Sequence, residues 1–294
     1  MSMTANEVFL TLRGALARLD KDLSDFMKSQ GLDPAPGSQA ATERATYIQA
    51  ESLDTVSAIS SMLLESVGEH ASLVVKAMTE PINTLACWTC VRSMLESSVI
   101  AAWLHDPKID AHKRVSRAFA HRYEGLEEQV KFGRAANVPT NDLKKLEDLI
   151  DTLEQDAVAL GFAAVRDRHG KRIGIAERTL SASEMIKIML NEECAYRALS
   201  AVAHAHTWAI LPLGFKRHAT QSPQSLNGAR ITMLEKSAGS VEGHAFHVVR
   251  AAKALALPVW NQCLYFGWDQ AKLTELLESI YDDMKAKPVI RFWR

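Results

Sequence analysis

Residues 81–104 read PINTLACWTCVRSMLESSVIAAWL and place an apolar side chain at every third or fourth position. The residues that set this period are Leu85, Trp88, Val91, Leu95, Val99 and Trp103. Such spacing is typical of an α-helix that buries one face against other helices. Because proline is common in the first turn of a helix, the stretch predicts a helix that begins at Pro81 and ends at Leu104.

The same helical period continues on both sides of this stretch. We expect further helices over residues 6–30, 42–73 with a break near Gly68, 110–136, 141–160, 193–213, 240–266 and 269–286, and a short one after Ser181. Residues 161–180 lack the period around a DRHGKR turn, which indicates a hairpin or a mobile loop and the one place for strands. Residues 216–230 read as a surface loop. The sequence therefore predicts an all-α fold, a multi-helix bundle of roughly eight helices with one short irregular or hairpin segment near 161–180.

A linker is expected near the N-terminus, where residues 31–43 read GLDPAPGSQAATE. Glycine, proline and serine interrupt helices and favour turns, which is why this composition is typical of a connecting segment. The chain then divides into an N-terminal helical arm over residues 1–30, the linker over 31–43 and a helical bundle domain over 44–294.

The composition suits a protein that folds around a core inside the cell. The chain has 294 residues, of which 47% are hydrophobic, and its formal net charge of -1 argues against coating duplex nucleic acid or anionic lipid by charge alone. The four cysteines fit a reducing compartment, and the N-terminus lacks the pattern of a secretory signal. No apolar run reaches the roughly 18 residues that a membrane span needs. We therefore expect a cytoplasmic protein without a membrane partner.

Arg197 is the one fully charged side chain within residues 194–214, an otherwise apolar helix. Ser200 follows it by one turn and His204 by two, and seven residues return to within about 20° of the same face. A histidine acting as general acid or base, beside an arginine that stabilises a developing phosphorane charge, can cleave a phosphodiester without a metal. Arg197 and His204 are therefore candidate catalytic residues. In the alternative interpretation, Arg197 pairs with Glu193 and His204 hydrogen-bonds to a neighbouring helix.

Two further sets of polar residues belong to this hypothesis. Arg92 and Glu96 are one turn apart and are the only charges of the 81–104 helix, so they either join helices as a buried pair or extend the candidate catalytic cluster. Arg114, Arg117 and His121 share one face of the next helix, which is either a phosphate-binding face or an ordinary solvated one.

The sequence brings together no side chains that would hold a metal or a cofactor. His204 and His206 project about 200° apart on a helix, whereas His244 and His247 are one turn apart but lack a third ligand. The CWTC of residues 87–90 has redox spacing but lies in the middle of a helix, where its thiolate is not stabilised. We expect neither metal nor cofactor.

Two segments resemble a family of bacterial, actinobacterial-type helical proteins: YRALSAVAHAHTWA at residues 196–209 and RSMLESSVIAAWLHDPKIDAHKRVSR at residues 92–117. That family shares a Tyr-Arg-x-Leu-Ser-x-x-x-His helix and an upstream Arg-x-x-x-Glu helix that ends in Trp-Leu-x-Asp-Pro. The matching residues are Tyr196, Arg197, Leu199, Ser200 and His204 for the first motif and Arg92, Glu96, Trp103, Leu104, Asp106 and Pro107 for the second.

More distantly, the spacing of Arg197 and His204 resembles the signature of the HEPN domain, the higher eukaryotes and prokaryotes nucleotide-binding domain. In toxin and phage-defence proteins that domain is a metal-independent ribonuclease that works as a homodimer. The resemblance implies that His204 is the general acid or base for RNA, that Arg197 and Arg92 stabilise the phosphate, and that Arg114 and Arg117 position the RNA. The implied supporting residues are Glu96, Glu193, Ser200 and Tyr196.

The alternative prediction is a non-catalytic helical binding or regulatory protein, with a regulatory protein as its partner. Many relatives of the HEPN domain are inactive binding modules, and Ala198 follows Arg197 where the signature usually has a polar residue. In this alternative, the same Arg, Glu and His side chains form a buried structural network.

Overall fold

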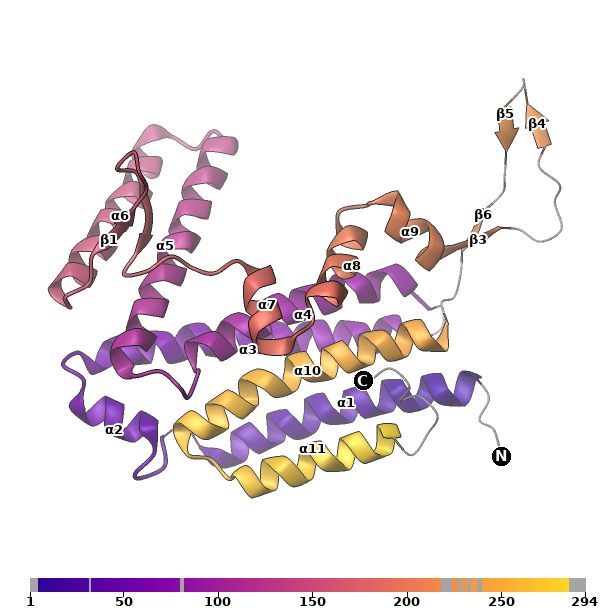
Figure 1. Ribbon diagram of the computed structural model, residues 1–294, viewed down its shortest axis with the longest axis horizontal. Helices are drawn as coiled ribbons and strands as arrows, with labels where there is room; N and C mark the ends of the chain where they lie inside the picture. The colour runs from indigo at the N-terminus through magenta and orange to yellow at the C-terminus, as the bar shows by residue number, and fades with distance from the viewer. Residues whose placement is uncertain are drawn as a thin grey trace.

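The computed structural model describes residues 5–31, 33–79, 82–217, 224–226, 229–231, 234–236 and 240–285 of the chain. This part is almost entirely helical, which confirms the all-α prediction (Figure 1). The helices are α1 (Ala5–Gln30), α2 (Gln39–Thr46), α3 (Ala50–Ala77), α4 (Thr84–Leu104), α5 (Ala111–Ala135), α6 (Thr140–Ala159), α7 (Ala182–Leu190), α8 (Glu193–Ala203), α9 (Thr207–Gly214), α10 (Val241–Phe266) and α11 (Gln270–Lys285). The strands are β1 (Ala164–Arg166), β2 (Arg172–Ile175), β3 (Phe215–Arg217), β4 (Gln224–Leu226), β5 (Ala229–Ile231) and β6 (Leu234–Lys236).

The eleven helices of the described residues exceed the roughly eight that were expected. One reason is α2, which begins inside the predicted linker because the Ser38 hydroxyl caps it, accepting a hydrogen bond from the backbone N–H of Ala41 at 3.1 Å. The predicted helix over 42–73 is accordingly replaced by the end of α2 and by α3, which continues through Gly68 without a break. Pro81, the predicted first residue of the central helix, lies outside the described residues, and α4 begins at Thr84.

The predicted helix over 193–213 divides into α8 and α9, which is the second reason for the higher count. Ala205 has a left-handed backbone (φ 57°), and the backbone N–H groups of His206 and Ala205 bond back to the carbonyls of Ala201 and Val202 at 2.9 and 3.0 Å. These two bonds form the Schellman motif that ends many helices, usually with glycine in the left-handed position. Because alanine favours the helix, this helix end could not be predicted from the sequence.

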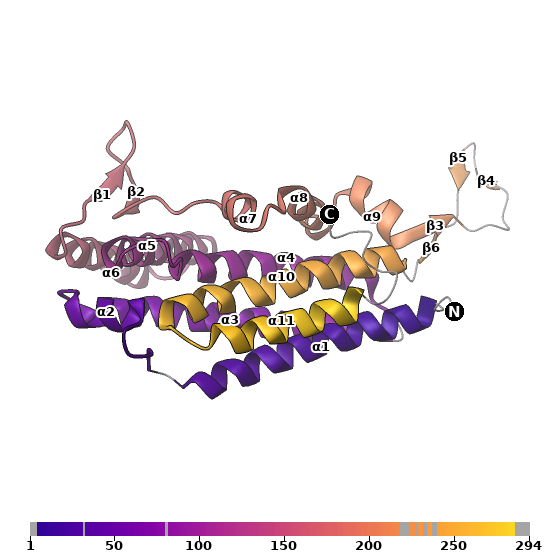
Figure 2. The same ribbon diagram turned by 60° about the horizontal axis from the view of Figure 1, so that its bottom comes forward.

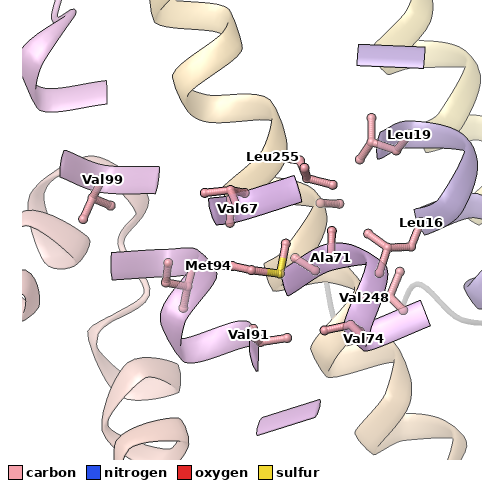
Figure 3. Packing of buried hydrophobic residues seen from close by; sticks show 14 of the residues in the cluster. Leu16, Leu19, Val67, Ala71, Val74, Val91, Met94, Val99, Val248 and Leu255 are labelled. Carbon is pink, nitrogen blue, oxygen red and sulfur yellow. The ribbon is translucent and has the colours of Figure 1, made fainter. Parts of the chain in front are cut away.

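The main core lies where α4 packs against α3, α10, α7 and α8. Figure 2 shows α7 and α8 on one side of α4 and α10, with α1 and α11 on the opposite side. Figure 3 shows side chains from four helices meeting in this core, among them Leu16, Leu19, Val67, Val74, Val91, Met94, Val248 and Leu255. The buried face of the 81–104 segment is therefore the centre of the fold.

α1 packs into this bundle, whereas residues 1–30 were predicted to be an N-terminal helical arm. Its apolar face is buried against α10, α11 and α3, and the buried residues include Leu12, Leu16, Leu19, Leu23 and Phe26. Burying one such side chain contributes about 1.5–3 kcal/mol, so five together hold the helix firmly in place.

A second, smaller core lies between α5, α6 and β2. We call these three elements, together with β1, the α5–α6 lobe. It extends from one end of the bundle (Figure 1). Its buried residues include Phe119, Tyr123, Val130, Ile150 and Leu153. β1 and β2 pair antiparallel, so the hairpin predicted within residues 161–180 is present.

Strands also occur outside that hairpin, contrary to expectation. β3 pairs with β6 and β4 pairs with β5, both antiparallel. β4 and parts of β3 and β5 lie within residues 216–230, which were predicted to be a surface loop. The remainder of residues 216–230 lies partly outside the described residues. Within the described residues, we find no helix with the length and apolar content that crossing a membrane requires.

Candidate functional site

Arg197, a candidate catalytic residue, lies on the solvent-facing side of α8. Its side chain is 72% exposed, and its Nη2 and Nε atoms donate to Oε1 of Glu193 at 2.8 and 3.2 Å. Glu193 also lies 3.4 Å from the Nζ of Lys187, and the hydrogen bond from Arg197 is the main reason that the pKa of this carboxyl is lowered. The Arg197 charge is therefore matched by an intrahelical partner.

His204 is the residue that ends α8, and it is exposed. Its ring centroid is 6.4 Å from that of His206, and Trp208 beyond them is 65% exposed. Because Arg197 is also exposed, the two candidate catalytic side chains are open to solvent and are not part of a buried network. The alternative prediction, which placed His204 in a buried hydrogen bond to a neighbouring helix, is therefore wrong for this residue.

Arg92, Glu96 and Tyr196 do form a partly buried cluster, and it joins α4 to α8. The Tyr196 hydroxyl donates to Oε1 of Glu96 at 2.6 Å, and the Nη2 of Arg92 lies 3.0 Å from the same carboxylate. The Arg92 guanidinium lies 5.9 Å from the centre of the Tyr196 ring. Burial and the hydrogen bond to Glu96 raise the pKa of Tyr196 above its ordinary value. Ser200, the other supporting residue on α8, is half-buried.

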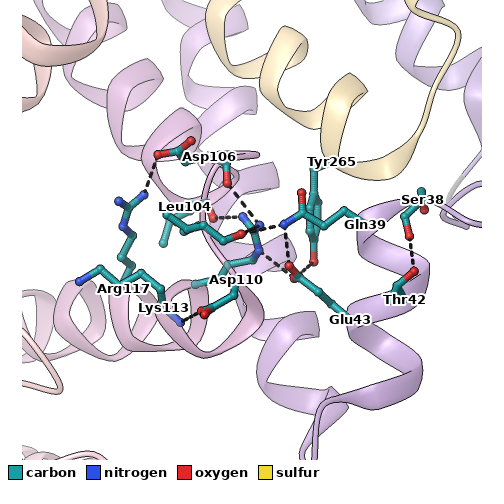
Figure 4. Close-up of polar contacts among 12 residues, drawn as sticks. Ser38, Gln39, Thr42, Glu43, Leu104, Asp106, Asp110, Lys113, Arg117 and Tyr265 are labelled. Carbon is teal, nitrogen blue, oxygen red and sulfur yellow. Dashed lines mark hydrogen bonds and ion pairs between the residues drawn. The ribbon is translucent and has the colours of Figure 1, made fainter.

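Arg114 is completely buried, so it is not on the phosphate-binding face where the sequence analysis placed it. Its Nε donates to Glu43 at 3.1 Å, and its Nη1 donates to the Leu104 carbonyl at 2.8 Å. The Nη2 group donates to the carbonyls of Asp106 and Ile109 at 3.3 and 3.2 Å. Tyr265 completes the site: its ring stacks under the guanidinium, with 3.9 Å from Cζ to the ring centre, and its hydroxyl donates to Glu43 at 3.0 Å (Figure 4).

Arg117 and His121 are also held within the protein. Arg117 donates to the Trp103 carbonyl, lies 3.5 Å from Asp106 and covers the Trp103 ring. His121 is half-buried, and burial lowers the pKa of its ring. The three residues therefore do not form a basic surface, and the phosphate-binding prediction fails because the helix turns this face toward α4.

A cleft with a volume of about 980 Å³ lies between α1, α3 and α10. We call it the α1–α3 cleft. Its apolar lining consists of Leu23, Met27, Leu64, Leu255 and Val259, together with Phe266 and Trp268. Charged side chains from α1, α2 and α3 surround this lining. Side-chain periodicity does not predict this cleft, because a groove between helices arises from how the helices diverge in space.

His105 lies in the lining of the cleft and is fully buried. Its Nδ1 lies 3.0 Å from the Ser60 hydroxyl, which also accepts a hydrogen bond from Nε2 of Gln262 at 3.1 Å. Its Nε2 has no hydrogen-bond partner among the described residues. Burial, with the charge of Arg114 as a second cause, lowers the pKa of His105 to about 3, so the ring is neutral. That nitrogen has almost no accessible surface, so a molecule in the cleft does not reach it.

The charges at the cleft divide into paired and unpaired groups. The Nζ of Lys21 lies 2.7 Å from Oδ2 of Asp25, and the Nη2 of Arg44 lies 2.9 Å from Oδ1 of Asp54. Asp20 has no ion pair among the described residues, and its pKa is raised first by burial and then by the charge of Glu65. Within the described residues, no three His, Cys, Asp or Glu side chains gather closely enough to hold a metal ion.

Comparison of the chain with family models, with curated proteins and with solved structures finds no match.

Proposed function

We propose that this protein is a non-catalytic helical binding protein, and that its ligand site is the α1–α3 cleft. The observation that carries the proposal is a cleft of about 980 Å³ in which apolar side chains of α1, α3 and α10 lie beside charged side chains of α1, α2 and α3. Ligand pockets in proteins typically enclose about 300–1,000 Å³, are mostly apolar and contain a few polar groups that fix the orientation of the ligand.

The roles of the other polar residues support this proposal. Arg114 and Arg117, which a ribonuclease would use to position RNA, are bound to carbonyls at the end of α4 and to Glu43 and Asp106. The cluster of Arg92, Glu96 and Tyr196 joins two helices. These residues set the positions of helices, as the binding-protein alternative requires of them.

A neutral dye tests the proposal, and prodan, an uncharged naphthyl ketone, is suitable. We expect prodan fluorescence to rise and shift to shorter wavelength on binding to the wild type. Ser57→Trp should abolish this change, because Ser57 lines the cleft and indole would fill it. Ser72→Trp is the matched control, since Ser72 is half-buried on the same helix outside the cleft lining. Equal binding by both variants would refute the assignment of the cleft.

A second candidate function, a metal-independent HEPN-like ribonuclease acting as a homodimer, is favoured by one observation. Arg197 and His204 are both exposed, and by helical geometry they lie on one side of α8. In this candidate His204 transfers the proton and Arg197, released from Glu193, stabilises the phosphate charge.

Incubation with total tRNA in EDTA separates the two functions. As a binding protein, the wild type should leave the tRNA intact, as should His204→Ala. Cleavage that is lost in His204→Ala but kept in His206→Ala, with circular dichroism showing both variants folded, would establish the ribonuclease instead. His206 is the appropriate control because it is an exposed histidine two residues away.

A further inference from the structure

α3 presents an exposed line of side chains beside the α1–α3 cleft. Met62 is 65% exposed and Leu73 is 48% exposed. They are eleven residues apart, which is roughly 16 Å along a helix axis and within about 20° of one line on its surface. Glu69 lies between them on this line and Glu65 lies beside it, and both glutamates also line the cleft. We call these four residues the α3 edge.

The charge of α3 has one sign over most of its length. Its acidic residues are Glu51, Asp54, Glu65 and Glu69, whereas its first lysine or arginine is Lys76, in the last turn. An acidic surface repels the phosphates of nucleic acids and of anionic lipids, and it attracts cationic partners. The α3 edge therefore suits a partner that is both apolar and positively charged.

Three carboxylates gather where α1 and α3 converge. Gly68 marks this point, since a Cβ added to it would lie 3.5 Å from Oδ1 of Asp20. Glu69 follows Gly68 in the chain, and Glu65 precedes it by three residues. Burial and, second, the charge of Glu65 raise the pKa of Asp20. A cation placed here would offset the repulsion between the carboxylates.

The cations of the cleft lining are paired with other carboxylates. The Nζ of Lys21 lies 2.7 Å from Oδ2 of Asp25, and the Nη2 of Arg44 lies 2.9 Å from Oδ1 of Asp54. The pKa of Asp25 is lowered by the hydrogen bond and charge of Lys21 and, more weakly, by the charge of Lys28, the third cation of the lining. Within the described residues, the three carboxylates near Gly68 have no ion pair, so a cationic ligand can pair with them.

The shape of the surface favours a helical ligand. The backbone N–H and C=O groups of α3 bond within the helix, so an extended chain cannot add to it as a strand would add to a sheet. A partner helix with apolar residues at helical spacing can pack along the α3 edge and reach the half-buried Leu64 and Met27 in the cleft. A small molecule inside the cleft would leave Met62 and Leu73 uncovered.

We propose, building on the binding function proposed above, that the ligand is a cationic amphipathic helix of a partner protein, which lies along the α3 edge. Its apolar residues cover Met62 and Leu73 and enter the cleft. Its lysine or arginine side chains pair with Asp20, Glu65 and Glu69.

Three labelled peptides of about 14 residues test the inference by fluorescence anisotropy at low salt. The first has leucine and lysine at helical spacing, the second has glutamate in place of lysine, and the third scrambles the order of the first. We expect the first to bind about tenfold more tightly than either of the others, and added salt to weaken its binding. Equal binding of the first and third peptides, or tighter binding of the second, would overturn the inference.

Prodan separates this failure from failure of the proposed function. If prodan binds the wild type and the lysine peptide does not, the helical partner is excluded and the cleft remains a site for small ligands. If neither binds, the proposed function is overturned as well.

Charge reversal tests the acidic side of the site. Glu65→Lys combined with Glu69→Lys should weaken binding of the lysine peptide about tenfold. The matched control combines Asp148→Lys with Asp156→Lys, because both are exposed acids of α6 without an ion pair among the described residues, and net charge changes equally. Equal losses in the two double variants would mean that the peptide responds to net charge alone, which would contradict the assigned site.

A second pair of variants tests the apolar line. Met62→Ser combined with Leu73→Ser should weaken binding about fivefold, whereas Leu149→Ser combined with Val158→Ser, at positions of α6 that are 52% and 57% exposed, should not. Unchanged affinity in the α3 variant would refute the proposal. The occupant would instead be a second copy of this chain if light scattering showed a dimer that the α3 variants dissociate, with no peptide binding by the wild type.

Discussion

Arg114 holds three segments of the chain together from inside the protein. Its guanidinium binds Glu43 of α2, the carbonyls that end α4 and, through its face, Tyr265 of α10. A buried charge is tolerated only when its donors are satisfied, and here four acceptors supply the bonds. This residue therefore fixes the positions of helices and is unavailable to an external phosphate.

Arg114→Met is expected to lower the free energy of unfolding by about 3–5 kcal/mol, because it leaves the Glu43 carboxylate buried without its cation. Denaturation in urea measures the loss. The control is Arg134→Met, which breaks a well-exposed pair with Glu147 at 2.8 Å and should cost less than about 1 kcal/mol. A similar loss in both variants would mean that the buried network contributes no special stability.

Two buried histidines should make the protein less stable in acid. Burial is the main cause that lowers the pKa of His105 and of His247 to about 3, with Arg114 acting on the first and with His244 and Arg250 acting on the second. The unfolded chain binds these protons near pH 6.5, so stability is complete above that pH and falls toward pH 3, by up to about 1.4 kcal/mol per pH unit for each ring. In His247→Phe the slope of unfolding free energy against pH should be smaller, whereas the exposed His169→Phe should keep the wild-type slope.

The break between α8 and α9 depends on one alanine. Ala205 adopts the left-handed backbone that a glycine adopts without steric cost. Ala205→Gly should therefore raise the melting temperature, with a gain of about 1 kcal/mol, although it removes a side chain. Ala198→Gly, inside α8, should lower stability by about the same amount. Calorimetry of both variants checks the opposite signs, and a loss in both would contradict the assigned turn.

The same break shows what a sequence analysis can and cannot provide. The period of Leu85, Trp88 and Val91 predicted α4, and similar periods predicted α1, α5, α6, α10 and α11 to within a few residues. The left-handed turn at Ala205 was not predictable because alanine favours helix. The buried position of Arg114 was missed for a related reason: an arginine on an amphipathic helix reads as exposed unless its partners, 71 residues away at Glu43, are known. The α1–α3 cleft depends on such long-range packing throughout.

At the scale of the whole molecule, the bundle and the α5–α6 lobe have separate cores. Side chains in the lobe contact mainly one another, with Leu53 of α3 joining them. Regions with their own small core often open at a lower free energy than the rest of a protein. The lobe and the bundle should therefore differ in their protection against hydrogen exchange.

Leu153→Ala, in the lobe core, is expected to speed amide exchange in α5, α6 and the β1–β2 hairpin and to leave α4 and α10 nearly unchanged. The local loss should be about 2–5 kcal/mol, as for other buried leucines. Met94→Ala, in the bundle core, should speed exchange across α3, α4 and α10. Mass spectrometry of the exchanged peptides resolves the two patterns, and a uniform increase in both variants would show one cooperative unit.

The position of α1 has a consequence for synthesis on the ribosome. Its apolar face is covered by α3 and, to a larger extent, by α10 and α11, which are the last described helices of the chain. At about 5–20 residues per second, the 210 residues between Gln30 and Val241 take roughly 10–40 seconds to translate. During that interval the leucine face of α1 lacks the two helices that will cover it, so the nascent chain presents an apolar binding stripe for a ribosome-associated chaperone until α10 and α11 have been made.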